Sequence, residues 1–473
     1  MRAVTKYLAA RGRSRVALTC PTGAAARVAS SPHLHGVTIH KYFNVQSRLR
    51  NPEHSKAAQR ERRSKQELEL AAVNVDADFE ECKEETVRGL PTAILNKECE
   101  ERFRRLKTLV IDEISMASAD FLSLISDALQ LARGNKRPFG GVQVIATGDF
   151  WQLAPVCTTG EARWAFQSPL WTFDTCELTH CVRQRGDMTY AKILGRMRVG
   201  ATTPEDIAYI NRNSRKATNV VPHTTLSPYN KQCDAINRDR VDAMPGNARD
   251  YKAELSIVEL LENRPFWRTR PYATKKPIKT PSIYCKTPLR IKVNTVVRST
   301  RNVYREPRGI HDMVVCNGQR GVVTRLGPDD ASVRWDPVGD EPPVSTIVRP
   351  TATLRRQSFD SARGLPVYAV VHSLALKPAF AITTHSSQGS SLKGCVDVDV
   401  TSRQPPPSGK GNWVTKPASC YVALSRVEAL AACRLTVPLH REHIAIDPVV
   451  ASWARAGYPK GGDAPAASLK VAT

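Results

Sequence analysis

The chain has 473 residues, of which 41% are hydrophobic and 24% charged, so its composition is ordinary for a globular protein and excludes a wholly disordered chain. Lys and Arg outnumber Asp and Glu by 69 to 45, which gives a net charge of +24 and an isoelectric point near 9.7. This charge predicts a polyanionic partner, nucleic acid first, although a basic surface kept for solubility or a membrane surface would fit the same count.

Three apolar runs are typical of interior strands in a parallel sheet, because none of them alternates with polar residues. They are "RVALT" (15–19), "TLVID" (108–112) and "VQVIATGD" (142–149). Between the last two, residues 119–134 carry apolar side chains at helical spacing and end on Gly134, a common helix stop. The pattern predicts a β-α-β unit.

Other stretches have the composition of linkers or loops. Residues 48–107 contain many acidic and basic residues close together, which favours solvated helices or a flexible insertion. Residues 264–308 hold thirteen Lys or Arg, one acid and interleaved aromatics, a pattern that fits either single-stranded nucleic acid or a charged linker. Residues 402–413 are Pro-rich and predict a surface loop, and residues 459–473 predict a frayed tail.

The cysteines and the hydropathy restrict the class further. The twelve cysteines are scattered without a C-x-x-C pair. We therefore do not expect zinc ribbons, and we expect reduced thiols in an intracellular protein. No run of about 18 apolar residues occurs, so no membrane span is predicted.

The run "TLVIDEISM" (108–116) ends on two adjacent carboxylates, Asp112 and Glu113. Carboxylates at a buried strand end must be paired, protonated or bound to a cation. Alone, such a pair is more often a helix cap or a satisfied ion pair. However, "TGDFWQLAPV" (147–156) places Asp149 and Gln152 at the end of the next strand, where open α/β sheets bind ligands.

Further stretches follow in a fixed order: "CVRQ" (181–184), "THSSQG" (384–389) and "YVALSRV" (421–427). Together with "TCPTGAAA" (19–26) and the two strand ends above, they resemble the petite-integration-frequency family of helicases, in the RecD-like branch of helicase superfamily one. "LRIKVNTVVRSTRN" and "CNGQRGVV" look like the SH3-like insertion of that family, with Asn294 where a Gly is usual.

The resemblance implies an α/β fold of two RecA-like parallel-sheet motor domains with an SH3-like β insertion in the second. We expect motor domain 1 at 1–175, with the charged insertion at 48–107, and motor domain 2 at 176–260 and 366–455. The basic segment and the SH3-like insertion would occupy 261–365, and a flexible tail 456–473.

The resemblance also implies roles in ATP hydrolysis with Mg²⁺. Asp112 would hold the Mg²⁺, and Glu113 would orient the attacking water. Gln152 would sense the γ-phosphate, while Gln388 and Gly389 would contact the nucleotide. Arg183 and Arg426 would stabilise developing negative charge from the second motor domain, although either arginine alone would be read as a surface ion pair.

The DNA-facing residues implied in the same way are Thr22, Gly23, His40, His385 and Ser387. A lone histidine is more often packed or solvated than ligand-binding, so both readings stand for the two histidines. Trp151 would either stack on a base or pack beneath Gln152.

The expected activity is that of an ATP-dependent helicase that moves 5′ to 3′ on single-stranded DNA in repair, recombination or genome maintenance. Single-stranded DNA and duplex junctions are the expected partners, with no membrane and a monomer favoured, in the nucleus or the mitochondrion. The phosphate-binding motif G-x-x-x-x-G-K-[ST] occurs nowhere in the 473 residues. We therefore expect little hydrolysis from the chain as given, and the alternative is a nucleic-acid-binding paralogue without ATP turnover.

Overall fold

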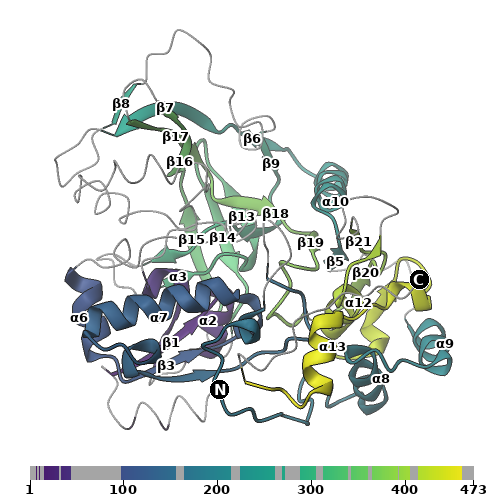
Figure 1. The fold of residues 1–473 in the computed structure, drawn as a ribbon. Helices are drawn as coiled ribbons and strands as arrows, with labels where there is room; N and C mark the ends of the chain where they lie inside the picture. The colour runs from purple at the N-terminus through teal and green to yellow at the C-terminus, as the bar shows by residue number, and fades with distance from the viewer. Residues whose placement is uncertain are drawn as a thin grey trace.

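The computed structural model describes residues 7, 10, 15–30, 34–43, 97–155, 164–214, 224–260, 269–271, 288–304, 313–338, 342–360, 365–392, 394–404 and 414–460. The charged insertion up to residue 96, most of the basic segment, most of the Pro-rich loop and residues 461–473 lie outside this range. Figure 1 shows one parallel sheet at the lower left, a second at the lower right, and antiparallel strands above them.

Lobe 1 is built on a four-stranded sheet of order β2-β1-β3-β4 in which every pair is parallel. Its strands are β1 (Val16–Cys20), β2 (Gly36–Thr38), β3 (Thr108–Ile111) and β4 (Gln143–Ala146). The three predicted runs are therefore strands, but only β1 and β3 are interior, and β4 lies at the edge of the sheet. Its helices are α2 (Gly23–Ala29), α3 (Ile39–Tyr42), α6 (Lys97–Arg105) and α7 (Ala119–Arg133). Helix α7 begins after Ser118, whose hydroxyl accepts from Phe121 N, and ends at Gly134 with φ +61°, as its sequence predicts.

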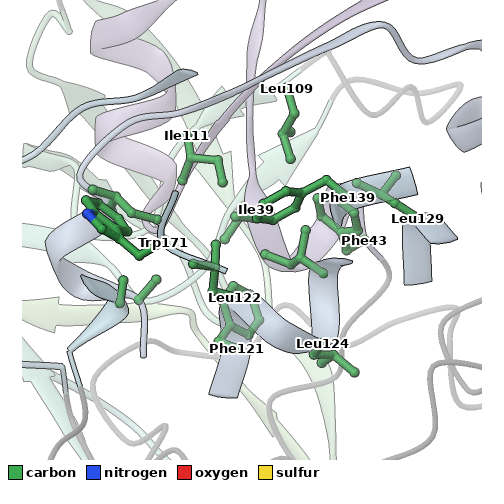
Figure 2. Packing of buried hydrophobic residues seen from close by; sticks show 14 of the residues in the cluster. Ile39, Phe43, Leu109, Ile111, Phe121, Leu122, Leu124, Leu129, Phe139 and Trp171 are labelled. Atoms are coloured by element: carbon green, nitrogen blue, oxygen red, sulfur yellow. The ribbon is translucent and has the colours of Figure 1, made fainter. Parts of the chain in front are cut away.

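The core of lobe 1 lies between this sheet and the apolar faces of α3, α6 and α7. Figure 2 shows Leu109 and Ile111 of β3 facing Phe121, Leu122 and Leu129 of α7. A second part of this core is aromatic and includes Phe150, Trp164, Phe166 and Trp171.

The last helix, α13 (Pro448–Arg455), packs into lobe 1, although its sequence position assigned it to the second motor domain. Trp453 stacks on Phe166 with ring centroids 4.1 Å apart and planes 5° apart, and Val450 and Ala451 enter the same core. The chain therefore returns to lobe 1 after completing lobe 2.

Lobe 2 repeats the strand order of lobe 1. Its sheet runs β19-β5-β20-β23, and again every pair is parallel. In each of the two sheets, the strand that comes second in the lobe's sequence lies at the edge, and the strand that comes first in the sequence lies next to it. The strands are β5 (Thr224–Ser227), β19 (Ala381–Thr383), β20 (Val396–Val398) and β23 (Cys433–Leu435). The helices are α8 (Met188–Arg198), α9 (Pro204–Asn213), α10 (Asn230–Ala243) and α12 (Ser419–Ser425). The two parallel sheets confirm the expected fold class.

The antiparallel strands form two larger sheets. The five-stranded sheet β15-β14-β13-β10-β18 lies in the region where the SH3-like insertion is expected, and its strands are β10 (Val296–Ser299), β13 (Arg320–Leu326), β14 (Ala331–Trp335), β15 (Val344–Val348) and β18 (Leu376–Pro378). The four-stranded sheet β16-β17-β7-β8 consists of β7 (Glu254–Leu260), β8 (Thr269–Pro271), β16 (Thr351–Asp360) and β17 (Leu365–Ser373). Asn294, before β10, has φ +69°, which explains why a Gly suits this position and why Asn replaces it at low cost.

Smaller pairings complete the strand inventory: β6 (Arg249–Tyr251) with β9 (Leu289–Ile291), β11 (Val303–Tyr304) with β12 (Met313–Val315), and β21 (Arg403–Gln404) with β22 (Val414–Thr415). No helix in the described ranges is both long and apolar enough to cross a membrane. The nine described cysteines are all free thiols.

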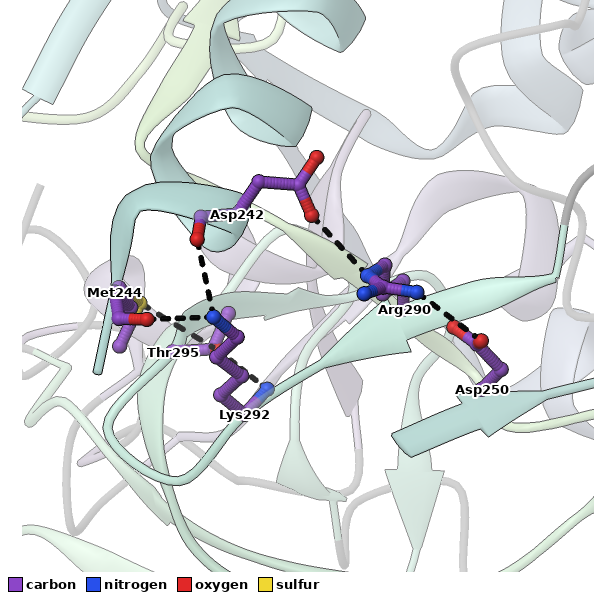
Figure 3. Close-up of polar contacts among 6 residues, drawn as sticks. All are labelled: Asp242, Met244, Asp250, Arg290, Lys292 and Thr295. Atoms are coloured by element: carbon purple, nitrogen blue, oxygen red, sulfur yellow. Dashed lines mark hydrogen bonds and ion pairs between the residues drawn. The ribbon is translucent and has the colours of Figure 1, made fainter. Parts of the chain in front are cut away.

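Polar contacts fasten the β region to both lobes. Figure 3 shows Lys292 Nζ donating to the carbonyls of Asp242 and Met244 at the C-terminus of α10, where a cation also suits the helix dipole. Arg290 bridges Asp242 and Asp250. On the lobe 1 side, the buried Arg27 of α2 donates to the side chain of Gln319 at 3.0 Å.

Candidate active site

The acidic couplet lies at the carboxyl end of β3, beside the ends of β1 and β4. Asp112 N donates to Thr19 O of β1 at 2.8 Å, and the carboxylate of Asp112 accepts from the hydroxyl of Thr147, which follows β4. The sheet order reverses between β1 and β3, which is the position where doubly wound sheets bind ligands. The couplet therefore lies where the sequence predicted it.

Glu113 has a left-handed backbone, with φ 51° and ψ 44°, directly before the short 3-10 turn Ile114–Met116. Residues with a Cβ rarely adopt this conformation, and such strain gathers at functional sites. Burial raises the pKa of Glu113, with Asp112 and Asp149 adding to the rise, while Arg426 and Arg183 lower it. The carboxylate thus interacts with charges from both lobes.

Lobe 2 approaches Glu113 directly. A Cβ built on Gly389, in the turn after β19, would lie 3.8 Å from Glu113 Oε1. Gly389 has φ +77°, so a glycine suits the backbone at this contact. The predicted nucleotide residue Gly389 and the predicted water-orienting residue Glu113 therefore face each other across the lobes.

Arg426 ends α12 and its side chain is only 1% exposed. Its three nitrogens donate to Val422 O at 3.0 Å, Ser390 O at 3.3 Å and Ser425 Oγ at 2.7 Å, so these contacts orient the guanidinium without neutralising it. Burial and the nearby charge of Arg183 together lower the pKa of Arg426 to about 10, while Glu113 opposes the shift. The group remains a cation at neutral pH.

Arg183 lies next to Arg426, because both are attached to the end of α12. Arg183 donates to Ser391 Oγ at 2.8 Å and Ser425 O at 3.1 Å, and its neighbour Gln184 donates to Ser425 O and Val427 O. The motif "RQ" thus positions one arginine beside another, and the charges of both act on Glu113.

Two glutamine side chains at this site have buried polar atoms without a hydrogen-bond partner among the described residues. They are Oε1 of Gln152 and both Oε1 and Nε2 of Gln388. Leaving such atoms unpaired costs about 1–3 kcal/mol each, so each calls for a ligand or water. Both residues were predicted to contact nucleotide.

Asp149 joins the lobes through two residues that the sequence did not single out, Arg198 and Tyr421. Arg198 Nη2 lies 2.9 Å from Asp149 Oδ1, and the Tyr421 hydroxyl donates to Asp149 Oδ2 at 3.2 Å. Burial opposes charge on Arg198, but Asp149 raises its pKa above the ordinary value. Tyr421 lies within the motif "YVALSRV". Arg198 lies in none of the motifs and is marked in the sequence only by its position at the end of a helix.

Of the predicted DNA residues in lobe 1, Thr22 accepts from Ala25 N and so begins α2, with its backbone at the carboxyl end of β1. Gly23 is buried, and a Cβ at this position would lie 2.2 Å from Asn302 Oδ1. The lack of a side chain therefore allows the close contact with the β region. His40 stacks on Phe121 at 4.8 Å, and burial lowers its pKa to about 4, so the ring is neutral at pH 7.

In lobe 2, His385 and Ser387 share the turn that carries Gln388. His385 is half-buried and its carbonyl accepts from Gln388 N, while Ser387 is fully buried and donates to Thr384 O at 2.8 Å. Trp151 is 9% exposed and belongs to the lobe 1 core, which supports packing beneath the motif over stacking on a base.

Taken together, the fold and the site define a two-lobed protein of RecA-like parallel sheets, with carboxylates of one lobe facing arginines of the other. Residues 92–203 match the model of the PIF1-like helicase family. Over these residues the chain is similar to this family.

Individual relatives agree with the family match. The chain is 29% identical over 337 residues to the ATP-dependent DNA helicase PIF1 of Danio rerio, which covers 70% of the chain and 46% of that protein. It is 29% identical to the Pif1 helicase of Bdellovibrio bacteriovorus, over 74% of the chain and 70% of that protein. The chain thus spans about half the length of the first vertebrate relatives it matches.

Among solved structures, the fold is similar to a Bacteroides Pif1 helicase in complex with ADP-AlF3 and single-stranded DNA. The TM-score is 0.66, with 21% sequence identity over 96% of this chain and 89% of that one.

Proposed function

We propose that the chain is the motor part of an ATP-dependent DNA helicase that moves 5′ to 3′ on single-stranded DNA. The observation that carries the proposal is Glu113, whose carboxylate in lobe 1 faces Gly389 and interacts with the charges of Arg183 and Arg426 in lobe 2. A carboxylate opposite two arginines at a lobe boundary suits phosphoryl transfer to water, which needs positioning and charge stabilisation more than covalent catalysis.

The residues present fit a magnesium nucleotide. The buried amide of Gln388 has an Nε2 donor without a partner among the described residues, and Arg426 adds a buried positive charge. Asp112 offers carboxylate oxygen, which Mg²⁺ prefers. When bound, the Mg²⁺ would neutralise charge on the phosphates. Asp112 would hold it, with the Thr147 hydroxyl fixing the carboxylate.

The chain's own residues then divide the work. Glu113 would accept a hydrogen bond from the attacking water and receive its proton, and its raised pKa makes the ionised group a stronger base. Arg183 and Arg426 would stabilise the negative charge that develops on the phosphoryl oxygens. Since Glu113 must meet Arg183 and Arg426 from the other lobe, hydrolysis would depend on the two lobes being held together.

DNA is the proposed polymeric partner, with single strands and duplex junctions as its forms and a monomer as the working unit. The net charge of +24 supports a phosphate backbone as ligand. The related Bacteroides helicase was solved with single-stranded DNA, and another Pif1 structure concerns forked double-stranded DNA. We also propose work in DNA repair or recombination, in the nucleus or the mitochondrion, and this part of the proposal rests on the family resemblance alone.

A second candidate function is nucleic-acid binding without ATP turnover. It is favoured by the absence of G-x-x-x-x-G-K-[ST] from the 473 residues, because that loop binds the β- and γ-phosphates in P-loop proteins. The acidic couplet, the two glutamines and the two arginines favour the motor. A protein that only binds DNA does not need these groups of the two lobes to lie near one another.

The two candidates are separated by measuring ATP hydrolysis of the 473-residue chain with and without single-stranded DNA. The motor predicts slow hydrolysis that DNA stimulates and that Glu113→Gln abolishes while DNA affinity stays unchanged. DNA binding with no stimulated hydrolysis would favour the second candidate. In both cases DNA affinity should fall at least about tenfold between roughly 50 and 200 mM salt. Duplexes with a 5′ or a 3′ single-stranded tail test the polarity.

A further inference from the structure

The carboxylate of Asp149 collects donors from both lobes. From its own loop in lobe 1, Trp151 N donates to Oδ1 at 3.2 Å and Gln152 Nε2 donates to Oδ2 at 3.4 Å. From lobe 2, Arg198 Nε donates to Oδ1 at 3.0 Å and the Tyr421 hydroxyl donates to Oδ2 at 3.2 Å. Each oxygen therefore joins one donor of lobe 1 to one donor of lobe 2.

This arrangement constrains the amide of Gln152. One hydrogen of Nε2 points to Asp149, so the plane of the amide depends on where that carboxylate lies. The Oε1 atom of Gln152 is buried without a hydrogen-bond partner among the described residues, which leaves it to accept from a group that enters the cleft. A shift of Asp149 would turn this acceptor.

The two lobe 2 donors are parts of one rigid unit. Arg198 ends α8 and Tyr421 lies in α12, and the two helices are joined by the fully buried hydroxyl of Tyr190, which donates to Leu424 O at 2.9 Å. Helix α12 ends at Arg426 and holds Arg183 through Ser425. The element that contacts Asp149 is therefore the same one that carries both arginines.

An ordinary surface ion pair would not have these properties. Arg196 on the same helix forms such a pair with Asp206, but both residues belong to lobe 2 and the guanidinium is 42% exposed. At Asp149 the paired side chains are 28% and 19% exposed, and the acceptor belongs to the other lobe. The hydrogen bonds at Asp149 thus depend on the position of one lobe relative to the other.

We propose that Asp149 is a positioning residue that couples the lobes: Arg198 and Tyr421 fix its carboxylate, and the carboxylate fixes the amide of Gln152 in the nucleotide cleft. When α8 and α12 move away, Asp149 loses two donors and Gln152 loses its orientation. When they return, the amide is set at the same time as Arg183 and Arg426 arrive. The inference rests on the proposed function for the role of Gln152, but its structural part does not.

The structural part is tested by amide hydrogen exchange of the whole chain without nucleotide, read on peptides that cover residues 147–153. Tyr421→Phe removes one hydroxyl in lobe 2 and should speed exchange of the Trp151 and Gln152 amides in lobe 1 about fivefold, as expected for one lost hydrogen bond. Arg198→Lys keeps the charge but loses the Nε donor and should do the same.

Tyr229→Phe is the matched control, because its hydroxyl also belongs to lobe 2 but contacts the main chain of Arg403 instead. It should leave exchange at 147–153 unchanged. Unchanged exchange in Tyr421→Phe, or an equal rise in the Tyr229 variant, would overturn the inference.

The functional part is tested by DNA-stimulated ATP hydrolysis. Tyr421→Phe should lower kcat about five- to tenfold and leave KM for ATP unaltered, because the amide of Gln152 would sense the γ-phosphate during hydrolysis and add little to ground-state binding of ATP. A change in KM for ATP without a change in kcat would contradict the proposed coupling through Asp149. If the unmodified chain hydrolyses no ATP, the proposed function fails, while the exchange result still decides whether Asp149 couples the lobes.

Discussion

Glu113 should lower the stability of the lobe that carries it, for two separable reasons. Its left-handed backbone, φ 51° and ψ 44°, costs a residue with a Cβ about 1–2 kcal/mol relative to glycine. Its carboxylate is buried near Asp112 and Asp149, and its pKa is raised accordingly. Replacing Glu113 by Gln removes the charge and keeps the Cβ, whereas replacing it by Gly removes both.

The expected magnitudes follow from this difference. Glu113→Gly should unfold with a free energy about 1 kcal/mol higher than Glu113→Gln, or a midpoint roughly 2–4 °C higher for a unit of this size. The charge effect depends on pH. Because the folded-state pKa of Glu113 lies above its ordinary value of 4.5, the wild-type chain loses stability as pH rises through that window. The advantage of Glu113→Gln over wild type should therefore grow from acidic to neutral pH.

Urea unfolding followed by tryptophan fluorescence is a suitable assay. The four tryptophans of the lobe 1 core report mainly on that lobe: Trp151, Trp164, Trp171 and Trp453. Asn294→Gly is the matched control, because Asn294 also has a positive φ but tolerates it, so the gain there should be smaller. If Glu113→Gly is no more stable than Glu113→Gln, the strain argument is wrong. If the gain from Gln does not change with pH, the charge argument is wrong.

Other substitutions test the connections between parts of the fold. Trp453→Ala removes the ring that stacks on Phe166 and should cost lobe 1 about 3–5 kcal/mol in urea unfolding, while Trp453→Phe should cost less than half of that. Gly23→Ala places a Cβ 2.2 Å from Asn302 Oδ1 and should cost about 1–3 kcal/mol, which the added change Asn302→Ala should recover. Lys292→Met removes two donors from the C-terminus of α10 and should speed amide exchange there about fivefold, whereas exchange in α7 should not change.

Much of the local structure could be predicted because it depends on short-range physics. The runs that form β1 and β3 are predictable because strands buried on both faces of a sheet are apolar along most of their length, whereas β4 lies at the sheet edge and is less buried. Helix α7 ends at Gly134 because the residue after the helix adopts φ +61°, which glycine adopts without strain. The placement of Asp112 and Glu113 at a strand end follows from the same pattern.

Other features could not be predicted, because they join residues far apart in the chain. Gly23 was expected to face DNA, but its lack of a side chain also makes room for Asn302 of the β region. Helix α13 follows the last strand of lobe 2 in sequence, yet the stacking of Trp453 on Phe166 attaches it to lobe 1. An amphipathic helix shows which of its faces is apolar, but not which core will bury that face.

The sequence by itself determined three strands and the main helix of lobe 1, the acidic couplet and the order of the motifs, since each depends on neighbours along the chain. Only the tertiary structure decided that Asp149 meets Arg198 and Tyr421, and that Glu113 faces Gly389. A carboxylate accepts from any suitable donor that the fold brings within reach, so its partners are fixed by how the two lobes pack and not by the residues on either side of it.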